Sequence, residues 1–308
     1  MQMSRRAFSA GVVAFPALLA TAAAAGPAEA GALTRALEEE RRRRGLPALA
    51  GLVMRHGRVL ESAAVGVRAR GADVTVAGSD RWHIGSCAKA MTATLIARYV
   101  ERGALDWNAT VGDLLPELSS GMDRAAARIT LHQLLTMTAG LPANPTSTPN
   151  EGGLANGLRL MISGNDHLIG QLRALEGLAD NDVERRKQIA ARMLASPPRW
   201  EPGSRFGYSN TAYVIVGAIA EAAGRAPYED LLAEEVFRPL GVESFGFGAP
   251  GRSDILDQPR GHVARRDGAP VPPDSVAAEL PSFLRPAGGV HMSLGDWSRF
   301  VADHVSGE

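Results

Sequence analysis

Lysine is almost absent from this chain of 308 residues, although basic residues as a class are not. The two lysines, Lys89 and Lys187, stand against 31 arginines, so arginine supplies nearly all of the solvated positive charge. A guanidinium stays charged in proteins, whereas a desolvated lysine can lose its proton. A position that keeps lysine is therefore a candidate for proton-transfer chemistry that arginine cannot perform.

The chain also has little cysteine, no closely paired histidines and no net charge. The one cysteine, Cys87, excludes an internal disulfide, and we interpret it as a small buried packing residue. The seven histidines show no paired spacing typical of a zinc site, so we predict no metal and no other cofactor. Acidic and basic residues balance at 33 each, which argues against binding of the whole chain to nucleic acid.

The run of glutamates and arginines at residues 38–44 is the one strongly charged segment. Its spacing gives three Glu–Arg pairs at i,i+4, and Gly45 suits the end of a helix. We therefore expect a solvated helix at 33–44 rather than a basic patch for nucleic acid.

The first 30 residues have the features of an export signal. The pair Arg5-Arg6 precedes an uncharged stretch, Gly11–Ala25, and residues 28–30 place alanines at the spacing of a cleavage site. The stretch is too short and too weakly apolar for a comfortable transmembrane helix. We predict a twin-arginine-type signal over residues 1–30, with export to the periplasm or the extracellular space. The alternatives are an uncleaved membrane anchor and a disordered tail.

Lys89 follows Ser86 by three residues, at the start of a stretch to Val100 that is helical in composition. Residues i and i+3 lie on one face of a helix, so the serine oxygen and the lysine nitrogen can meet. The first turn of a helix also offers free backbone N–H groups to a developing negative charge. Acyl transfer requires such an activated hydroxyl beside an oxyanion site. The alternative is a serine N-cap followed by a solvated lysine, which the apolar flanks disfavour.

A second candidate pair, Tyr208 and Asn210, lies in a glycine-marked loop before the apolar run Val214–Ile219. Residues two apart on an extended backbone point the same way. Taken alone, Tyr208 is better explained as a core tyrosine and Asn210 as a helix N-cap. In the company of Ser86 and Lys89, a functional role is favoured for both.

These motifs together resemble the serine β-lactamase and penicillin-binding-protein family, in particular class C β-lactamases, DD-peptidases and related esterases. The stretches that support the resemblance lie between Leu46 and about Arg299; in chain order they are Ile84–Lys89, Ile129–Pro142, Pro202–Tyr213, Pro239–Val242 and Gly288–Ser293. The resemblance implies that Ser86 is the nucleophile, with Lys89 as its base. It implies further that Tyr208 shuttles the proton and that Asn210 binds the substrate.

The sequence departs from this family at its third motif, a Lys-Thr-Gly or His-x-Gly triplet on a strand that supplies one oxyanion N–H. No such triplet follows Gly288-Gly289, and His291 lacks the glycine that the motif needs. The chain thus resembles a family member without its C-terminal strands, ending after Ser293–Asp296, which has the pattern of a helix capping box. Loss of one oxyanion donor typically costs about 10²–10³ in rate.

We predict an α+β fold of the β-lactamase/transpeptidase type over residues 31–308. It would have an antiparallel sheet flanked by helices, an inserted helical lobe, the site between them, and C-terminal strands missing. The sequence lacks the strand–helix–strand alternation that is typical of a parallel sheet, so we do not expect one. The expected helices are 33–44, 184–194, 211–223 and 227–236, the expected strands are 48–54 and 58–67, and 257–286 is expected to be a surface excursion.

The predicted function is that of a serine hydrolase forming an acyl-enzyme with a β-lactam, a D-Ala-ended peptide or a small ester. The alternative is a catalytically impaired, penicillin-binding-like fragment that binds a ligand or partner without turnover. A third possibility is that a second chain completes the sheet, and the sequence does not indicate the oligomeric state.

Overall fold

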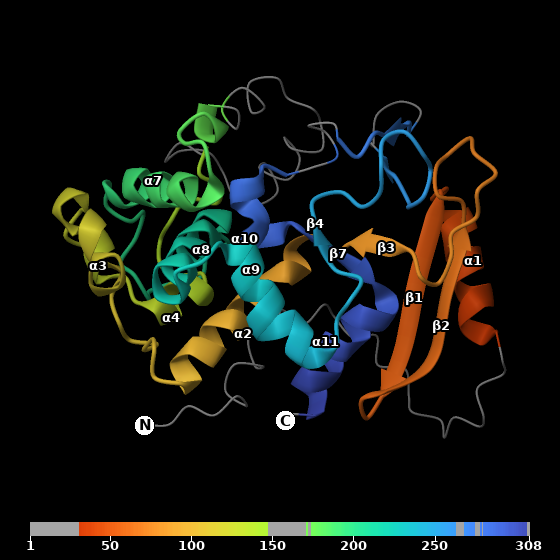
Figure 1. Cartoon of the computed structure of the whole chain (residues 1–308), viewed down its shortest axis with the longest axis horizontal. Helices are drawn as coiled ribbons and strands as arrows, with labels where there is room; N and C mark the ends of the chain where they lie inside the picture. Colours follow the sequence, from red (N-terminus) through yellow and green to blue (C-terminus); the bar gives the residue numbers. More distant parts are fainter. Residues whose placement is uncertain are drawn as a thin grey trace.

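The computed structural model describes residues 31–146, 171, 174–262, 268–274, 278 and 280–306. A helical region lies at one side of the molecule and a helix-covered hairpin at the other, with a small sheet between them (Figure 1). The predicted signal segment, residues 1–30, lies outside the described residues, as does most of 151–173. Within the described ranges, no helix combines the length and apolar character needed to cross a membrane.

The hairpin consists of β1 (Ala48–Arg55) and β2 (Arg58–Gly66), paired antiparallel. Its tight turn places both His56 and Gly57 at positive φ, 50° and 72°, as a two-residue turn that matches the strand twist requires. The turn predicted at His56-Gly57 is therefore confirmed.

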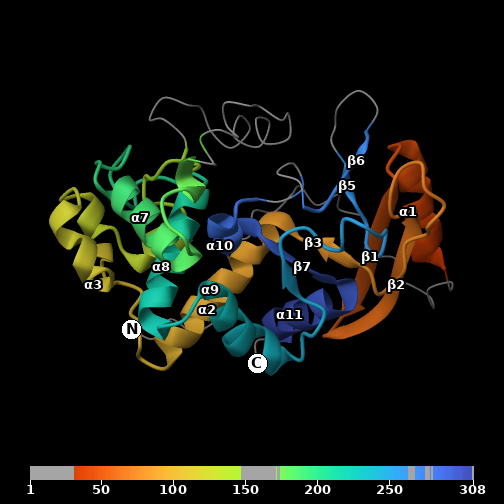
Figure 2. The ribbon, with the colours of Figure 1, turned by 45° about the horizontal axis from the view of Figure 1, so that its top comes forward.

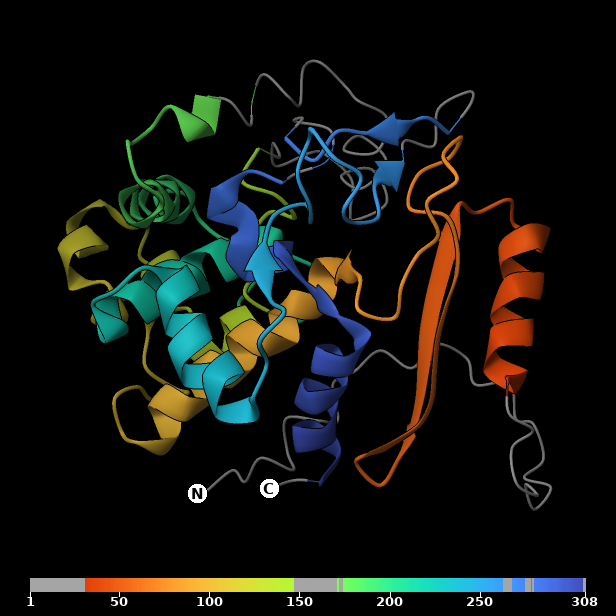
Figure 3. The same cartoon turned by 45° about the vertical axis from the view of Figure 1, so that its right-hand side comes forward.

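Helix α1 (Ala32–Arg43) covers one face of this hairpin (Figure 3). It approaches closely at Gly51, where an added Cβ would lie 3.1 Å from Leu37. The expected helix end is confirmed, because Gly45 has a φ of +63° and its N–H donates to the carbonyl of Arg42.

Two of the three predicted i,i+4 ion pairs form along α1. Glu38 pairs with Arg42, and Glu40 pairs with Arg44. The third predicted pair does not form, because Arg43 bonds Glu40 instead of Glu39.

The helical region is built around α2 (Ala88–Glu101) and α8 (Asn210–Gly224). Both are largely apolar, and the main hydrophobic core contains residues of both. The neighbouring elements are α3 (Val111–Leu114), α4 (Leu131–Leu135), α7 (Asp182–Leu194), α9 (Tyr228–Leu232) and a π-helical turn, Ala233–Phe237. The expected helices are thus present, with ends shifted by one or two residues.

The strands pair antiparallel throughout, as predicted, but they form three separate sheets. Strand β7 (Val290–Ser293) lies between β3 (Arg81–His83) and β4 (Gly246–Phe247). A short pair, β5 (Gly261–His262) and β6 (Pro270–Val271), stands apart from it. Within the described residues, β1 pairs with β2 alone.

The expected surface excursion at 257–286 is wrong at its C-terminal end. The turn Ser282–Leu284 buries Phe283, and α10 (Arg285–Gly288) follows it into the core. Figure 2 shows α10 close to both α2 and α8, and it contacts both helices. The C-terminal end of this segment is therefore a buried turn held by elements that are distant in the sequence.

The predicted capping box of the last helix, α11 (Leu294–Ser306), is half formed. The Ser293 hydroxyl accepts the N–H of Asp296 at 3.2 Å, as a cap should. The Asp296 carboxylate instead accepts the N–H groups of Glu243 and Ser244, and so ties α11 to the loop before β4.

Candidate active site

The nucleophile candidate lies on a tight turn between β3 and α2. The Ile84 N–H donates to the Val290 carbonyl of β7 at 3.0 Å, which fixes the end of the strand. Gly85 then takes a φ of +54°, which glycine adopts without steric cost, and the chain enters a 3₁₀ turn, Gly85–Cys87. Ser86 is exposed at the start of this helical segment. The next two N–H groups are already used, because Cys87 donates to the Ile84 carbonyl at 3.2 Å and Ala88 donates to the Gly85 carbonyl.

Lys89 lies one turn further on and is only 5% exposed. Its Nζ lies 2.7 Å from Asn210 Oδ1, 2.5 Å from the carbonyl oxygen of Ala287 and 3.4 Å from Ser86 Oγ. Burial disfavours the charged form and lowers the pKa of this amine to about 7. A substantial fraction of Lys89 is therefore uncharged at neutral pH.

These contacts define where the free electron pair of that uncharged amine points. The Ala287 carbonyl can only accept, and so can Asn210 Oδ1, because the Nδ2 of the same amide donates to Asn144 Oδ1 at 2.8 Å. A neutral amine has two hydrogens, and these two acceptors use both. Its lone pair is then left for the third contact, the Ser86 hydroxyl.

Tyr208 contacts the same serine oxygen from the other side, with its phenol donating to Ser86 Oγ at 2.8 Å. Burial raises the pKa of Tyr208, so the phenol is protonated at neutral pH and can donate. The Lys89 nitrogen also lies 4.8 Å from the centre of the Tyr208 ring. The serine oxygen thus lies between a proton acceptor and a proton donor.

The loop that holds Tyr208 is fixed to the segment after α4 by backbone hydrogen bonds. The N–H groups of Gly203 and Gly207 donate to the carbonyls of Thr138 and Met137 at 2.9 and 2.8 Å. Gly207 is required for a second reason, because a Cβ there would lie 2.5 Å from the Trp200 ring.

The start of α8 is bonded to the same segment. The residue that caps this helix is not the one that the sequence suggested. The Asn210 N–H donates to the Ala143 carbonyl at 2.7 Å. The residue that caps the helix is Ser209, whose hydroxyl accepts the Ala212 N–H at 3.0 Å. The N-cap interpretation of Asn210 is therefore wrong, and its amide is free to contact Lys89.

The structure brings together all four residues singled out in the sequence, Ser86, Lys89, Tyr208 and Asn210. It adds two groups that the sequence analysis missed. Asn144, 9% exposed, lies two residues after the matched stretch Ile129–Pro142, but nothing in its spacing distinguished it from a loop residue. The second is the backbone carbonyl of Ala287. Every residue has such a carbonyl, so the amino-acid type could not have indicated it.

The interpretation of Cys87 as a buried packing residue is wrong, because this side chain is exposed beside Ser86. The 3₁₀ turn that precedes α2 rotates it away from the core. His291 is buried and bonds the Gly248 carbonyl through Nδ1 at 2.9 Å, and among the described residues it does not contact Ser86, Lys89 or Tyr208. The described residues also contain no cluster of three or more potential metal-binding side chains.

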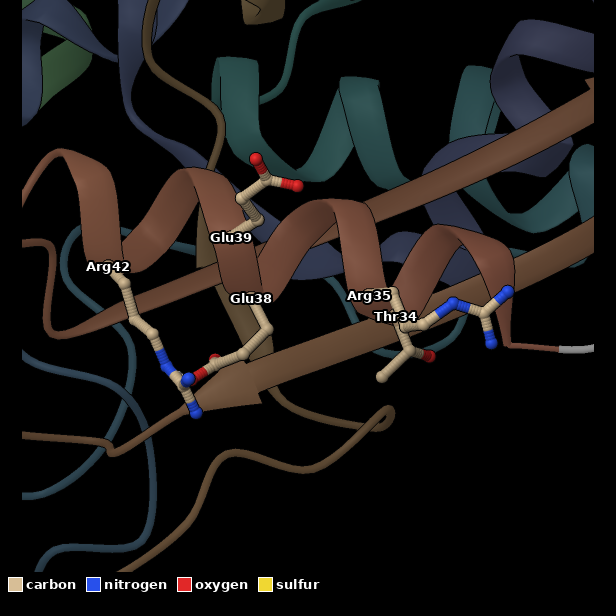
Figure 4. A pocket seen from close by; sticks show the side chains of 5 residues that line it. All are labelled: Thr34, Arg35, Glu38, Glu39 and Arg42. Carbon is tan, nitrogen blue, oxygen red and sulfur yellow. Dashed lines mark hydrogen bonds and ion pairs between the residues drawn. The ribbon is translucent and has the colours of Figure 1, made fainter.

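A shallow hollow elsewhere on the surface contains no such arrangement. It lies on α1 and is lined by Thr34, Arg35, Glu38, Glu39 and Arg42 (Figure 4). Glu38 and Arg42 point toward one another there and form an ion pair. Among its lining residues, no nucleophile lies beside a desolvated base.

A comparison with known protein families matches the beta-lactamase family model over residues 33–308. The chain belongs to this family. Penicillin-binding protein 4 of Amycolatopsis lactamdurans is 26% identical over 246 residues, which cover 80% of this chain and 56% of that protein. The chain thus spans little more than half the length of that relative.

Solved structures place the fold in the β-lactamase/transpeptidase group. A class C beta lactamase from Rhodobacter sphaeroides matches with a TM-score of 0.63 and 25% identity, over 88% of this chain and 64% of that one. The octameric penicillin-binding protein homologue from Pyrococcus abyssi matches with a TM-score of 0.63 and 22% identity, over 89% and 55%. The expected α+β fold of this type is confirmed.

Proposed function

We propose that this protein is a serine hydrolase that works through an acyl-enzyme on Ser86. The observation on which the proposal rests is the position of Ser86 Oγ, 2.8 Å from the Tyr208 phenol and 3.4 Å from the buried amine of Lys89. A solvated lysine would be charged at neutral pH and could not accept a proton, whereas burial keeps this one near pKa 7.

The reaction would proceed as two acyl transfers. Lys89 takes the Ser86 proton as the serine oxygen bonds the substrate carbonyl carbon, and the carbonyl oxygen becomes an oxyanion near the backbone N–H of Ser86. The C–N or C–O bond then breaks, the Tyr208 phenol protonates the leaving group, and Lys89 returns its proton to the phenolate. Water attacks the ester in the same way and releases the acid and Ser86.

The substrate class we propose is a β-lactam, a D-Ala-ended peptide or a small ester. Family membership and structural neighbours named as D-alanine carboxypeptidases support this range. Asn210 is our candidate for substrate binding. Its Nδ2 carries two hydrogens and gives one to Asn144 Oδ1, which leaves the other for a substrate carbonyl.

Covalent labelling tests the proposal without knowledge of the natural substrate. Purified protein is treated in parallel with a fluorophosphonate and with a β-lactam, and adducts are measured by intact mass. We expect one adduct with at least one reagent, its loss in Ser86→Ala, and its retention in Ser204→Ala, which removes a serine from the loop before Tyr208. Absence of any adduct, or an adduct that persists in Ser86→Ala, contradicts the proposal.

A second candidate function is binding without turnover. It is favoured by the residues from Gly289 to Glu308, among which no Lys-Thr-Gly or His-x-Gly triplet supplies a strand donor to the oxyanion hole. The test is to measure β-lactam binding by calorimetry and acylation by intact mass on the same protein. Binding without acylation over hours would favour this function over hydrolysis.

A further inference from the structure

The carbonyl of Ala287 is one of two acceptors that orient the Lys89 amine, and it sits on α10, a helical turn of four residues. Such a short turn cannot fix its own position through internal hydrogen bonds. The groups that hold α10 therefore also determine where the lone pair of Lys89 points. They are found on α2 itself and on α9.

Thr92 is the α2 residue next to Lys89 on this face, three residues along, and its side chain is completely buried. Its hydroxyl donates to the Pro286 carbonyl at 2.7 Å, one residue before Ala287. Two side chains of one helix face, Lys89 and Thr92, thus bond two successive carbonyls of α10.

The Thr92 hydroxyl is in turn bonded by Tyr228 of α9, with 2.7 Å between the two oxygens. A hydroxyl has one hydrogen, and its two carbonyl contacts, Pro286 at 2.7 Å and Ala88 of its own helix at 3.3 Å, can only accept. The hydrogen therefore goes to the nearer carbonyl, that of Pro286. Tyr228 must then be the donor to Thr92. Because Tyr228 is completely buried, this directed chain from Tyr228 through Thr92 to Pro286 satisfies groups that no water can reach.

Packing leaves α10 little room to move away from this chain. An added Cβ at Gly217 of α8 would lie 2.5 Å from Pro286, so helix and turn are in close contact. On the other side, a Cβ at Gly288 would lie 3.5 Å from the backbone of Gly85, in the nucleophile turn. Within this close packing, the hydroxyl chain adds a directed hydrogen bond that helps to fix the register of the α10 carbonyls against α2.

We infer that Thr92, supported by Tyr228, is a positioning residue for the base: it holds α10 so that the Ala287 carbonyl orients the Lys89 amine toward Ser86. This inference rests on the proposed function, and it adds two residues that do not touch the reacting atoms. It differs from simple core packing because valine can replace threonine in shape but cannot bond Pro286.

The first test separates positioning from binding by the kinetics of fluorophosphonate labelling. We expect Thr92→Val to lower the maximal labelling rate of Ser86 by on the order of tenfold to a hundredfold, because small misplacements of catalytic groups cost this much. The reagent concentration at half-maximal rate should stay within about twofold, since uniform binding is untouched. Thr92→Ser, which keeps the hydroxyl, should restore the rate, and Tyr228→Phe should have an intermediate effect because the bond to Pro286 remains.

Thr94 provides a matched control on the same helix. Its hydroxyl bonds the Ala90 carbonyl and His304, away from α10, so Thr94→Val removes the same group without touching the chain. Labelling of Thr94→Val should equal that of the wild type. Equal rates in Thr92→Val and wild type, or a Thr92→Ser variant as slow as Thr92→Val, would overturn the positioning role.

A second readout does not depend on activity. The chain has two lysines, so ¹³Cε-labelled lysine gives two resonances, and Lys187→Arg assigns them. An ammonium that loses the Ala287 acceptor while still buried is less stable, so the Lys89 midpoint should fall in Thr92→Val and not in Thr94→Val. If the wild type takes no label, the proposed function is wrong. The titration midpoint of Lys89 in the variants then tests the positioning role of Thr92 by itself. An unchanged or higher midpoint in Thr92→Val overturns it.

Discussion

Eleven consecutive residues of α8, Thr211–Glu221, are buried, whereas α1, β1 and β2 contain no buried residue in the part of the chain described. The hairpin even leaves Val53, Val59 and Leu60 46–62% exposed. All six groups of the candidate site come from the well-buried region or from loops fixed to it. Side chains that must meet within a few tenths of an ångström are thus placed by the part of the molecule that cannot shift without disrupting its core.

The two regions also use charge differently. On α1 the Glu–Arg pairs face water and neutralise a solvated helix, which contributes little to stability. In the helical region, the guanidinium of Arg186 is completely buried and bonds Glu221 at 2.5 Å and Glu229 at 3.1 Å. Arg186 also donates to the Ser282 carbonyl, so this network ties α7, α8 and α9 to the turn that precedes α10.

The largest expected effect comes from replacing the base in the buried region. Lys89→Arg should reduce the labelling rate of Ser86 by roughly 10²–10⁴-fold, because a guanidinium cannot accept the serine proton. Lys187→Arg is the matched control, since that side chain is 38% exposed and pairs only loosely with Glu117 at 3.6 Å. Stopped-flow or timed intact-mass measurements report both rates. Comparable labelling in Lys89→Arg and Lys187→Arg would contradict the role of the amine.

The next effect concerns stability and contrasts the two kinds of ion pair. Glu221→Gln leaves the Arg186 charge buried with less compensation and should lower the free energy of unfolding by about 3–5 kcal/mol. Glu40→Gln makes the same change on α1 and should leave the urea midpoint unchanged within error. If both variants unfold at the same urea concentration, the two regions do not differ as their burial indicates.

The dependence of acylation on pH should follow the Lys89 amine. Burial lowers its pKa to about 7, so the active, uncharged form is lost as the pH falls below that value. We expect the labelling rate to fall about tenfold per pH unit well below pH 7 and to level off above it. Rates measured from pH 5 to 9, with a pH-stable reagent, give the midpoint. A midpoint near 10, the ordinary range for lysine, would show a solvated amine.

The smallest effect is expected on the exposed hairpin. Leu60→Ser removes an apolar side chain that is 62% exposed, so the unfolding free energy should change by no more than about 0.5 kcal/mol. Ile215→Ala in α8 is the contrasting variant and should cost about 2–5 kcal/mol. Parallel urea titrations compare them, and a large loss for Leu60→Ser would mean that the outer hairpin face is covered in solution.

Local features of the fold were predictable because they depend on residues that are close together in the sequence. The hairpin turn at His56-Gly57 and the C-cap at Gly45 follow from backbone preferences of a few neighbouring residues. The end of the segment at 257–286 was predicted wrongly for the converse reason. Its burial comes from contacts with α2 and α8, which lie far away in the sequence.

The sequence by itself determined which side chains are candidates for chemistry: Ser86 and Lys89 one helical turn apart, and Tyr208 and Asn210 together on one loop. Helix and strand spacing suffices for this, because it acts over a few residues. Only the tertiary structure decided the state of the amine. Its burial, the Ala287 carbonyl 198 residues away and the Asn144 amide 66 residues from Asn210 are contacts between distant segments. No local pattern encodes such contacts, because they depend on how whole elements pack.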